Sequence, residues 1–85
     1  MREEVLTYLN KMIREEKGNR VTEESTWLDA SVDSFGTVIV FMALDSKYDY
    51  FRKGGYGEDP FKEIPYTTLT IKEIIDICTL ETTST

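Results

Sequence analysis

Apolar residues recur at helical spacing in the first part of the chain. Between residues 2 and 16 they fall three or four positions apart, which places them on one face of an α-helix. Acidic residues open this segment and basic residues close it, an order that suits the helix dipole. The pattern therefore predicts an amphipathic helix over residues 2–16. Its apolar face consists of Val5, Leu6, Leu9, Met12 and Ile13.

The most apolar segment predicts a second helix over residues 34–48. Its Val-Ile-Val run also favours a strand, but the length of the segment and the Met-Ala-Leu that follows favour a helix. Asp33, directly before it, is a good N-cap residue. Between the two helices, residues 17–33 lack sustained periodicity and predict a long loop. The expected core anchors of this loop are Val21, Trp27 and Leu28.

Residues 50–58 predict a flexible loop, because they contain three of the five glycines together with Arg52 and Lys53. Asp59-Pro60 then predicts a short helix over residues 60–64, since proline is favoured at the first helical position.

The last part of the chain predicts one more helix, over residues 70–79, which opens with the capping-box pattern Thr70-Ile-Lys-Glu73. Residues 81–85 predict a frayed tail. Together these elements predict an all-α fold, a small four-helix bundle of three main helices plus one short helix. At 85 residues the chain is long enough for a single domain, spanning residues 1–85.

Charge and composition narrow the range of functions. Sixteen Asp and Glu against ten Lys and Arg give a net charge of -6, which disfavours nucleic acid and membrane surfaces as partners. The chain contains no histidine, so the commonest general base is absent and we expect no enzyme activity. The single cysteine, Cys78, excludes an internal disulfide and suggests a reducing compartment. We expect a cytoplasmic protein without metal ligands, and a monomer.

The N-terminal region and the apolar segments predict neither a signal peptide nor a membrane span. The chain starts with the polar, acidic Met-Arg-Glu-Glu. Its longest apolar run, Val38 to Leu44, is far too short to cross a bilayer.

Ser34 is the residue best placed for chemistry. At the start of the second helix its hydroxyl would face solvent, and an attached phosphate would face the unpaired N–H groups and the positive end of the helix dipole. The simpler interpretation is that Asp33-Ser34 only caps the helix. The same dipeptide recurs as Asp45-Ser46, but near the C-terminal end of the helix, where an anion is disfavoured.

The sequence around Ser34 resembles the acyl carrier proteins of fatty-acid and polyketide synthesis. The run from Asp33 reads Asp-Ser-Phe-Gly-Thr-Val-Ile-Val-Phe-Met-Ala-Leu-Asp-Ser-Lys-Tyr-Asp, which is similar to that family's Asp-Ser-Leu signature and its Val-Met-Ala-Leu-Glu continuation. Downstream, Ile64-Pro65 and the helix from Thr70 to Asp76 also resemble family segments. The resemblance covers most of the chain, although its specific motif spans only about a dozen residues.

The resemblance implies a fold of the acyl-carrier-protein type and a covalent cofactor. Ser34 would be esterified with 4'-phosphopantetheine from coenzyme A by a phosphopantetheinyl transferase that recognises Asp33 and Phe35. The cofactor's thiol would carry acyl groups as thioesters between acyl-loading and acyl-transferring enzymes with basic docking surfaces. Ile39 and Asp45 are the candidate partner-docking residues. The candidate acyl-pocket residues are Phe35, Val38, Met42 and Leu44, for each of which ordinary core packing is the alternative.

The chain departs from the family at four places. Ala30-Ser31 stands where the family has Leu-Gly, whose glycine would serve a tight turn, so the loop is expected to differ in shape. Phe35 replaces a leucine. Gly36 and Ile39 replace acidic residues that meet basic patches on partners, so Ile39 offers either an apolar contact or, as we favour, a buried side chain.

An acidic helical adaptor or inhibitor that binds a basic protein surface without a prosthetic group is the alternative function.

Overall fold

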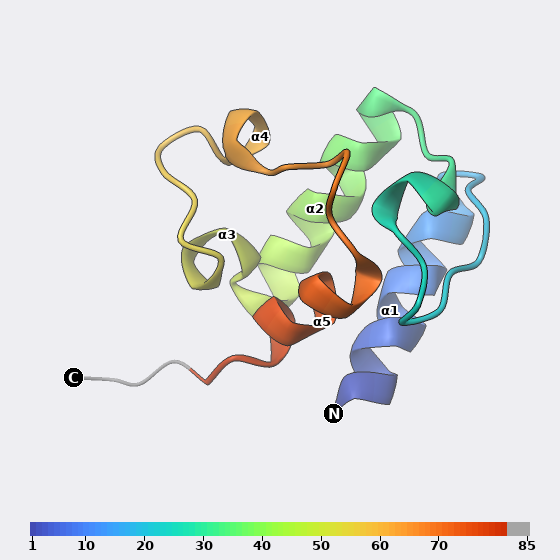
Figure 1. Cartoon of the computed structure of the whole chain (residues 1–85), viewed down its shortest axis with the longest axis horizontal. Helices are drawn as coiled ribbons and strands as arrows, with labels where there is room; N and C mark the ends of the chain where they lie inside the picture. Colours follow the sequence, from blue (N-terminus) through green and yellow to red (C-terminus); the bar gives the residue numbers. More distant parts are fainter. Residues whose placement is uncertain (82–85) are drawn as a thin grey trace.

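The computed structural model describes residues 1–81, which form five α-helices and one 3₁₀ helix without a β-strand (Figure 1). The prediction of an all-α fold is confirmed. Of the tail predicted over residues 81–85, only Glu81 lies within the described residues. In chain order the elements are α1 (Arg2–Glu15), the 3₁₀ helix η1 (Trp27–Ala30), α2 (Ser34–Tyr48), α3 (Tyr50–Lys53), α4 (Pro60–Glu63) and α5 (Ile71–Thr79).

The three longer helices enclose the core. Helix α5 contacts α1, α2 and α3, and α1 also packs on α2 (Figure 1). Each helix buries residues three or four positions apart, as expected for an amphipathic helix that presents one face to the interior. The fully buried residues of these helices are Val5, Leu9 and Ile13 from α1, Val40, Phe41 and Leu44 from α2, and Ile71, Ile74 and Ile75 from α5.

The helix starts that Asp33 and the Thr70-Glu73 pair predict are confirmed, whereas Asp59 precedes α4 without a side-chain capping hydrogen bond. The Asp33 carboxylate accepts a 2.7 Å hydrogen bond from the Gly36 N–H at the start of α2. Thr70 and Glu73 form a reciprocal capping box at the start of α5. These side chains satisfy N–H groups that have no partner within the helix, so they fix where each helix begins.

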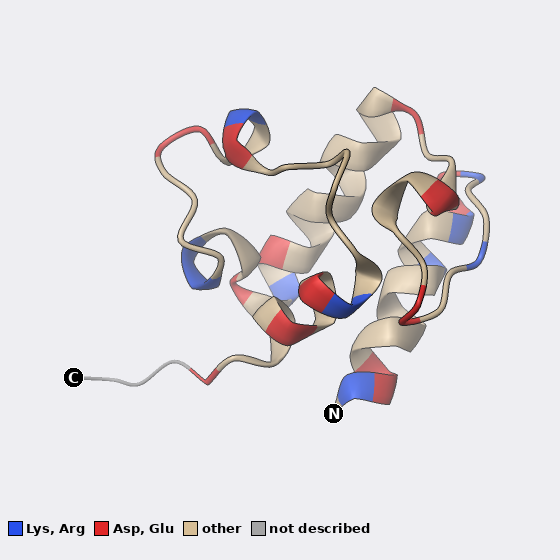
Figure 2. Ribbon diagram, viewed as in Figure 1, with Lys and Arg blue, Asp and Glu red and all other residues tan. Residues whose placement is uncertain are grey.

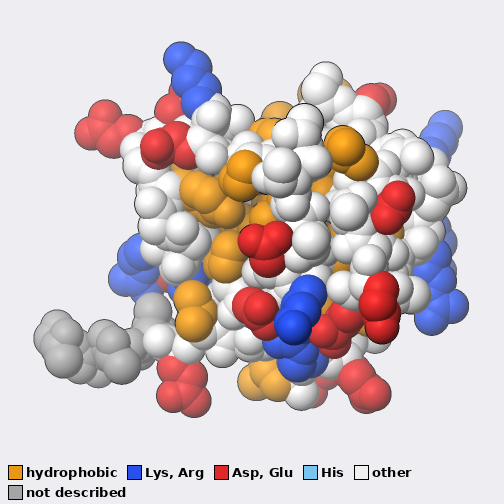
Figure 3. All heavy atoms as spheres, in the orientation of Figure 1, with side chains coloured by type: hydrophobic (Ala, Val, Ile, Leu, Met, Phe, Trp, Pro, Cys, Tyr) orange, Lys and Arg blue, Asp and Glu red, His pale blue; other side chains and the backbone are white. Residues whose placement is uncertain are grey.

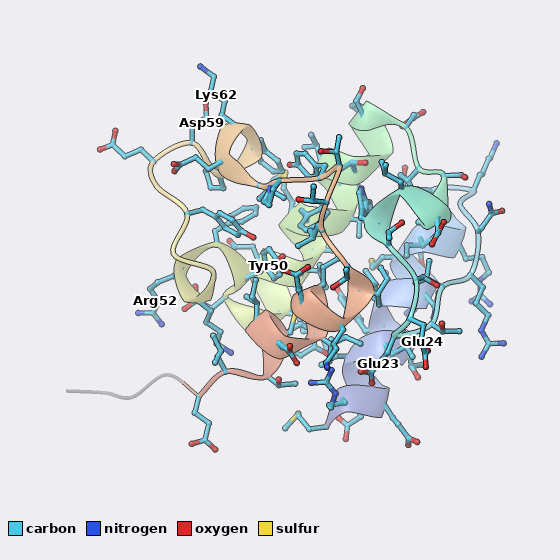
Figure 4. All side chains as sticks on the ribbon, viewed as in Figure 1. Glu23, Glu24, Tyr50, Arg52, Asp59 and Lys62 are labelled. Atoms are coloured by element: carbon cyan, nitrogen blue, oxygen red, sulfur yellow. The ribbon has the colours of Figure 1, made fainter. Side chains whose placement is uncertain are left out.

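The predicted glycine-rich loop over residues 50–58 is partly wrong, because its first four residues form α3. The chain turns at Asp49, which adopts a left-handed conformation with φ of 60°. The Asp45 carboxylate then accepts a 2.9 Å hydrogen bond from the Phe51 N–H. Tyr50 is fully buried whereas Arg52 of the same short helix points outward (Figure 4). Burial of Tyr50 thus holds this segment against the bundle. The glycine content of the segment does not indicate this contact.

The long connection between α1 and α2 is anchored by two of its three expected anchors. Val21 and Trp27 are buried, but Leu28 is 56% exposed, so its assignment to the core is wrong. Trp27 and Leu28 belong to η1, which a capping box between Thr26 and Asp29 begins. Since adjacent residues of a helical turn point in different directions, only one of the two can face the core.

Backbone hydrogen bonds join this connection to the segment before α5. The Trp27 N–H donates to the Leu69 carbonyl at 2.8 Å, and the Ile71 N–H donates to the Ser25 carbonyl at 2.9 Å. The long connection is therefore tied to the start of α5 by backbone hydrogen bonds. No helix within residues 1–81 combines the length and the apolar character that crossing a membrane requires.

Asn10 fastens the other end of the connection to α1. Its side-chain amide donates to the Val21 carbonyl at 3.0 Å, and its side-chain oxygen accepts from the Val21 N–H at 2.8 Å. Both backbone polar groups of a buried residue are thereby satisfied.

We expect Asn10→Ala to lower the free energy of unfolding by about 1–3 kcal/mol, because it leaves the Val21 backbone groups unpaired. Asn19→Ala is the matched control, since Asn19 is an exposed asparagine in the same connection. Urea denaturation followed by circular dichroism measures both. Equal stability of the two variants would show that the Asn10 amide does not hold this loop.

Candidate functional site

Ser34 is the first residue of α2 and is exposed. The helix that it opens is 15 residues long and is capped by Asp33 directly before it. Its hydroxyl therefore lies at the positive end of a long helix dipole, where a negatively charged ester is stabilised. The other copy of the dipeptide places Ser46 in the last turn of the same helix, where that stabilisation is absent.

An apolar groove of about 340 Å³ lies beside Ser34. Its walls come from η1, from the first turns of α2 and from the α4 region, and hydrophobic side chains reach the surface between α4 and α2 (Figure 3). The groove brings together segments that are distant in the sequence. Its lining residues are Trp27, Leu28, Val32, Ser34, Thr37, Val38, Phe61 and Tyr66.

Packed aromatic rings lie beneath this groove. The Phe41 ring meets the rings of Trp27, Tyr50 and Tyr66 edge to face, with centroid distances of 5.0, 5.4 and 5.5 Å. Burial raises the pKa of Tyr50 far above its ordinary value, and burial also raises the pKa of Tyr66. Both phenols therefore stay neutral at physiological pH, and no charge develops beside the apolar wall.

The four candidate acyl-pocket residues lie in three different environments: the groove, the core and the exposed surface. Val38 alone lines the groove. Leu44 is fully buried in the core, as its alternative interpretation holds. Phe35 is 74% exposed and Met42 is 56% exposed, so neither belongs to the core or to the groove.

Phe35, Ile39 and Met42 form a line along the outer face of α2, which we call the outer stripe. Their spacing of four and then three residues places them on one side of the helix. Ile39 is 37% exposed, so the expectation that it is buried is wrong. Residues 34–44 contain no charged side chain, which leaves this part of α2 uncharged (Figure 2). The outer stripe is thus an apolar surface that begins next to Ser34.

Asp45, the second candidate docking residue, is only half-buried but has a structural role. One of its carboxylate oxygens accepts the hydrogen bond from Phe51 that begins α3. Its charge remains available at the end of the outer stripe, while its position is set by the turn between α2 and α3.

Gly36 is required by the packing of α2 against the end of α1. A Cβ atom at this position would lie 2.6 Å from a Val32 methyl carbon and 3.2 Å from the Glu16 Cβ. A carboxylate side chain has no room here without a shift of one of these elements. The absence of an acidic residue at Gly36 therefore follows from close packing.

Ser31 takes the tight turn for which a glycine was expected. Its φ of 53° and ψ of 40° are left-handed. Ser31 thus provides a left-handed residue before α2 although it is not a glycine, and the expected difference in loop shape from the carrier family stays a prediction. A side chain in this conformation is strained, whereas glycine adopts it without a penalty.

Cys78 has no place in the site. Its thiol is buried on α5, and burial raises its pKa to about 12. The thiolate, which is the reactive form, is therefore scarce at neutral pH. Among residues 1–81, no group of three or more Cys, Asp and Glu side chains is arranged to hold a metal ion.

Several groove residues were not identified as site residues in the sequence. Trp27 and Leu28 were expected to be core anchors, and no role was assigned to Val32, Phe61 or Tyr66. They come from three segments that only the folded chain brings together. The local signal of this surface was a pair of aromatic residues, Phe61 inside the short proline-initiated helix and Tyr66 shortly after it.

Comparison with protein-family models, with curated proteins and with solved structures found no match. The interpretation of the site therefore rests on its own geometry and on the motif around Ser34.

We expect Ser31→Gly to raise the free energy of unfolding by roughly 0.5–1 kcal/mol, because it relieves the left-handed strain. The control is Ser46→Gly, which should lower it by about 0.5 kcal/mol, because glycine destabilises a helix interior. Urea denaturation measures both changes. If the two substitutions changed the free energy of unfolding in the same direction, the left-handed turn before α2 would be contradicted.

Proposed function

We propose that this chain is an acyl carrier protein whose Ser34 holds 4'-phosphopantetheine. In the loading step the Ser34 hydroxyl oxygen forms a new bond to the phosphorus that bears the pantetheine arm of coenzyme A. Adenosine 3',5'-bisphosphate leaves and the hydroxyl proton is released. The terminal thiol of the attached arm then holds acyl groups as thioesters.

The observation that carries this proposal is that Ser34 lies in two environments at once. The residue opens a long capped helix, where a phosphodiester is stabilised, and it also lines an apolar groove. A phosphate anchor needs the first of these environments, and an apolar cargo at the end of the arm needs the second. A helix cap alone would need neither an exposed serine after the capping aspartate nor an apolar groove beside it.

The order of the elements supports a fold of the acyl-carrier-protein type. A long first helix, a long connection, a helix headed by Asp33-Ser34, a short helix and a C-terminal helix follow one another as the resemblance implies. Helix α3 and the 3₁₀ helix η1 are additions to the predicted four helices.

The outer stripe and Asp45 form the proposed contact surface for partner enzymes. A phosphopantetheinyl transferase that reaches Ser34 must cover Asp33 and Phe35, its immediate neighbours. Acyl-loading and acyl-transferring enzymes would use the apolar stripe, with basic side chains facing Asp33 and Asp45 at its ends. We place the protein in the cytoplasm and assign it no catalysis of its own, since it contains no histidine and a single buried cysteine.

We expect incubation with coenzyme A and a permissive phosphopantetheinyl transferase to add one phosphopantetheine group to the wild-type protein. Intact mass measures the gain. Ser34→Ala should remain unmodified yet keep its stability, because an exposed hydroxyl contributes little to the core.

Ser46→Ala is the matched control and should gain the group as the wild type does, since Ser46 lies in the same dipeptide at the other end of α2. Unfolding of Ser34→Ala would mean that Ser34 is structural. Loading of a standard carrier protein but not of this chain would contradict the proposal.

An acidic adaptor that needs no prosthetic group is the second candidate. The exposed outer stripe favours it, since exposed large apolar side chains in a row mark contact surfaces whether or not a cofactor is attached. The loading experiment separates the two functions, because only the carrier depends on Ser34.

A further inference from the structure

We infer that the cargo carried on Ser34 is a compact acyl group, an aromatic or short-chain one, in preference to a long straight alkyl chain. This inference rests on the proposed carrier function and concerns the groove beside Ser34. Three features of the groove support it: its size, its aromatic walls and its closed floor.

The size of the groove sets an upper limit to what it covers. Its volume is about 340 Å³. One water molecule takes up roughly 30 Å³ in the liquid, and the same share for each non-hydrogen atom of a cargo gives space for about eleven such atoms. A phenylacetyl group fits this space together with the end of the pantetheine arm. A straight ten-carbon acyl group has eleven non-hydrogen atoms, so together with the end of the arm it would exceed this space and extend into water.

Three of the eight residues that line the groove are aromatic. Trp27 comes from η1, Phe61 from α4, and Tyr66 from the segment that follows α4. The other lining residues are Leu28, Val32, Ser34, Thr37 and Val38. Aromatic rings pair favourably with another ring edge to face or offset, so these three residues suit an aromatic cargo better than a flexible chain.

The floor prevents a longer chain from entering the bundle. Phe41 is fully buried and contacts Trp27, Tyr50 and Tyr66 edge to face. Tyr50 is itself fully buried and stacks on Tyr56 at a centroid distance of 5.8 Å. A chain growing inward from the groove would have to separate these rings, since close-packed interiors leave no free channel. The cargo therefore stays in the groove.

The test attaches model cargoes directly at position 34 and needs no transferase. A Ser34→Cys variant is treated with methyl, benzyl and decyl methanethiosulfonate. In each case the Cys thiolate attacks the thiosulfonate sulfur, a disulfide forms and methanesulfinate leaves. The buried Cys78 thiol, with its pKa of about 12, stays unreactive, and the wild-type protein verifies this.

We expect the benzyl adduct to melt at least about 3 °C above the methyl adduct and the decyl adduct to melt no higher than the benzyl one. The benzyl adduct should also change the fluorescence of Trp27, the single tryptophan. The same adducts on Ser46→Cys, at the far end of α2, should melt together. Phe61→Leu in the Ser34→Cys background should remove most of the benzyl effect, because Phe61 lines the groove.

Two results would overturn the cargo class while leaving the carrier function intact: stabilisation that keeps rising to the decyl adduct, or benzyl and methyl adducts that melt together. Failure of Ser34 to accept phosphopantetheine would instead overturn the carrier function and the cargo assignment with it. Loading of the wild-type protein from phenylacetyl and decanoyl coenzyme A repeats the comparison on the natural arm. The phenylacetyl form is expected to be the more stable.

Discussion

The edge-to-face contacts of Phe41 hold together the parts of this molecule on which its proposed function depends. One ring on α2 meets Trp27 of η1, Tyr50 of α3 and Tyr66 from the segment after α4. These segments are far apart in the sequence, and hydrophobic burial alone would not align them in one way. Because aromatic pairs prefer defined geometries, the cluster fixes where η1 and the α4 region lie relative to α2. The groove beside Ser34 is the surface that results.

The elements with a local signal could be predicted from the sequence. Asp33 and the Thr70-Glu73 pair mark helix starts by capping chemistry that acts within four residues, and both are found where predicted. The α3 helix was missed because its cause is tertiary: Tyr50 is buried against Phe41, and Asp45 supplies a hydrogen bond from the preceding helix. The candidate site likewise has one part that the sequence predicts and one part that depends on the tertiary structure. Ser34 and its exposure follow from its place in the helix, whereas the groove depends on residues from three segments, and Phe35 and Met42 point away from it.

The residues that depart from the acyl-carrier pattern can be explained by the geometry around them. Ser31 adopts the left-handed conformation without being a glycine, at the cost of local strain. A Cβ at Gly36 would lie 2.6 Å from a Val32 methyl carbon and 3.2 Å from the Glu16 Cβ, so an acidic residue at this position would require a neighbour to shift. Ile39 joins Phe35 and Met42 in an uncharged outer stripe. The proposed docking surface around Ser34 would thus be apolar at its centre, which would suit partners with an apolar surface bordered by basic side chains.

The most direct test of the carrier function is the state of Ser34 in protein isolated from its native cells. Cleavage after Arg20 and Lys47 releases one peptide, residues 21–47, that contains both Ser34 and Ser46. Tandem mass spectrometry of this peptide locates any attached group and weighs its cargo. The carrier function predicts phosphopantetheine on Ser34 and none on Ser46. A peptide found only in its unmodified form would contradict it.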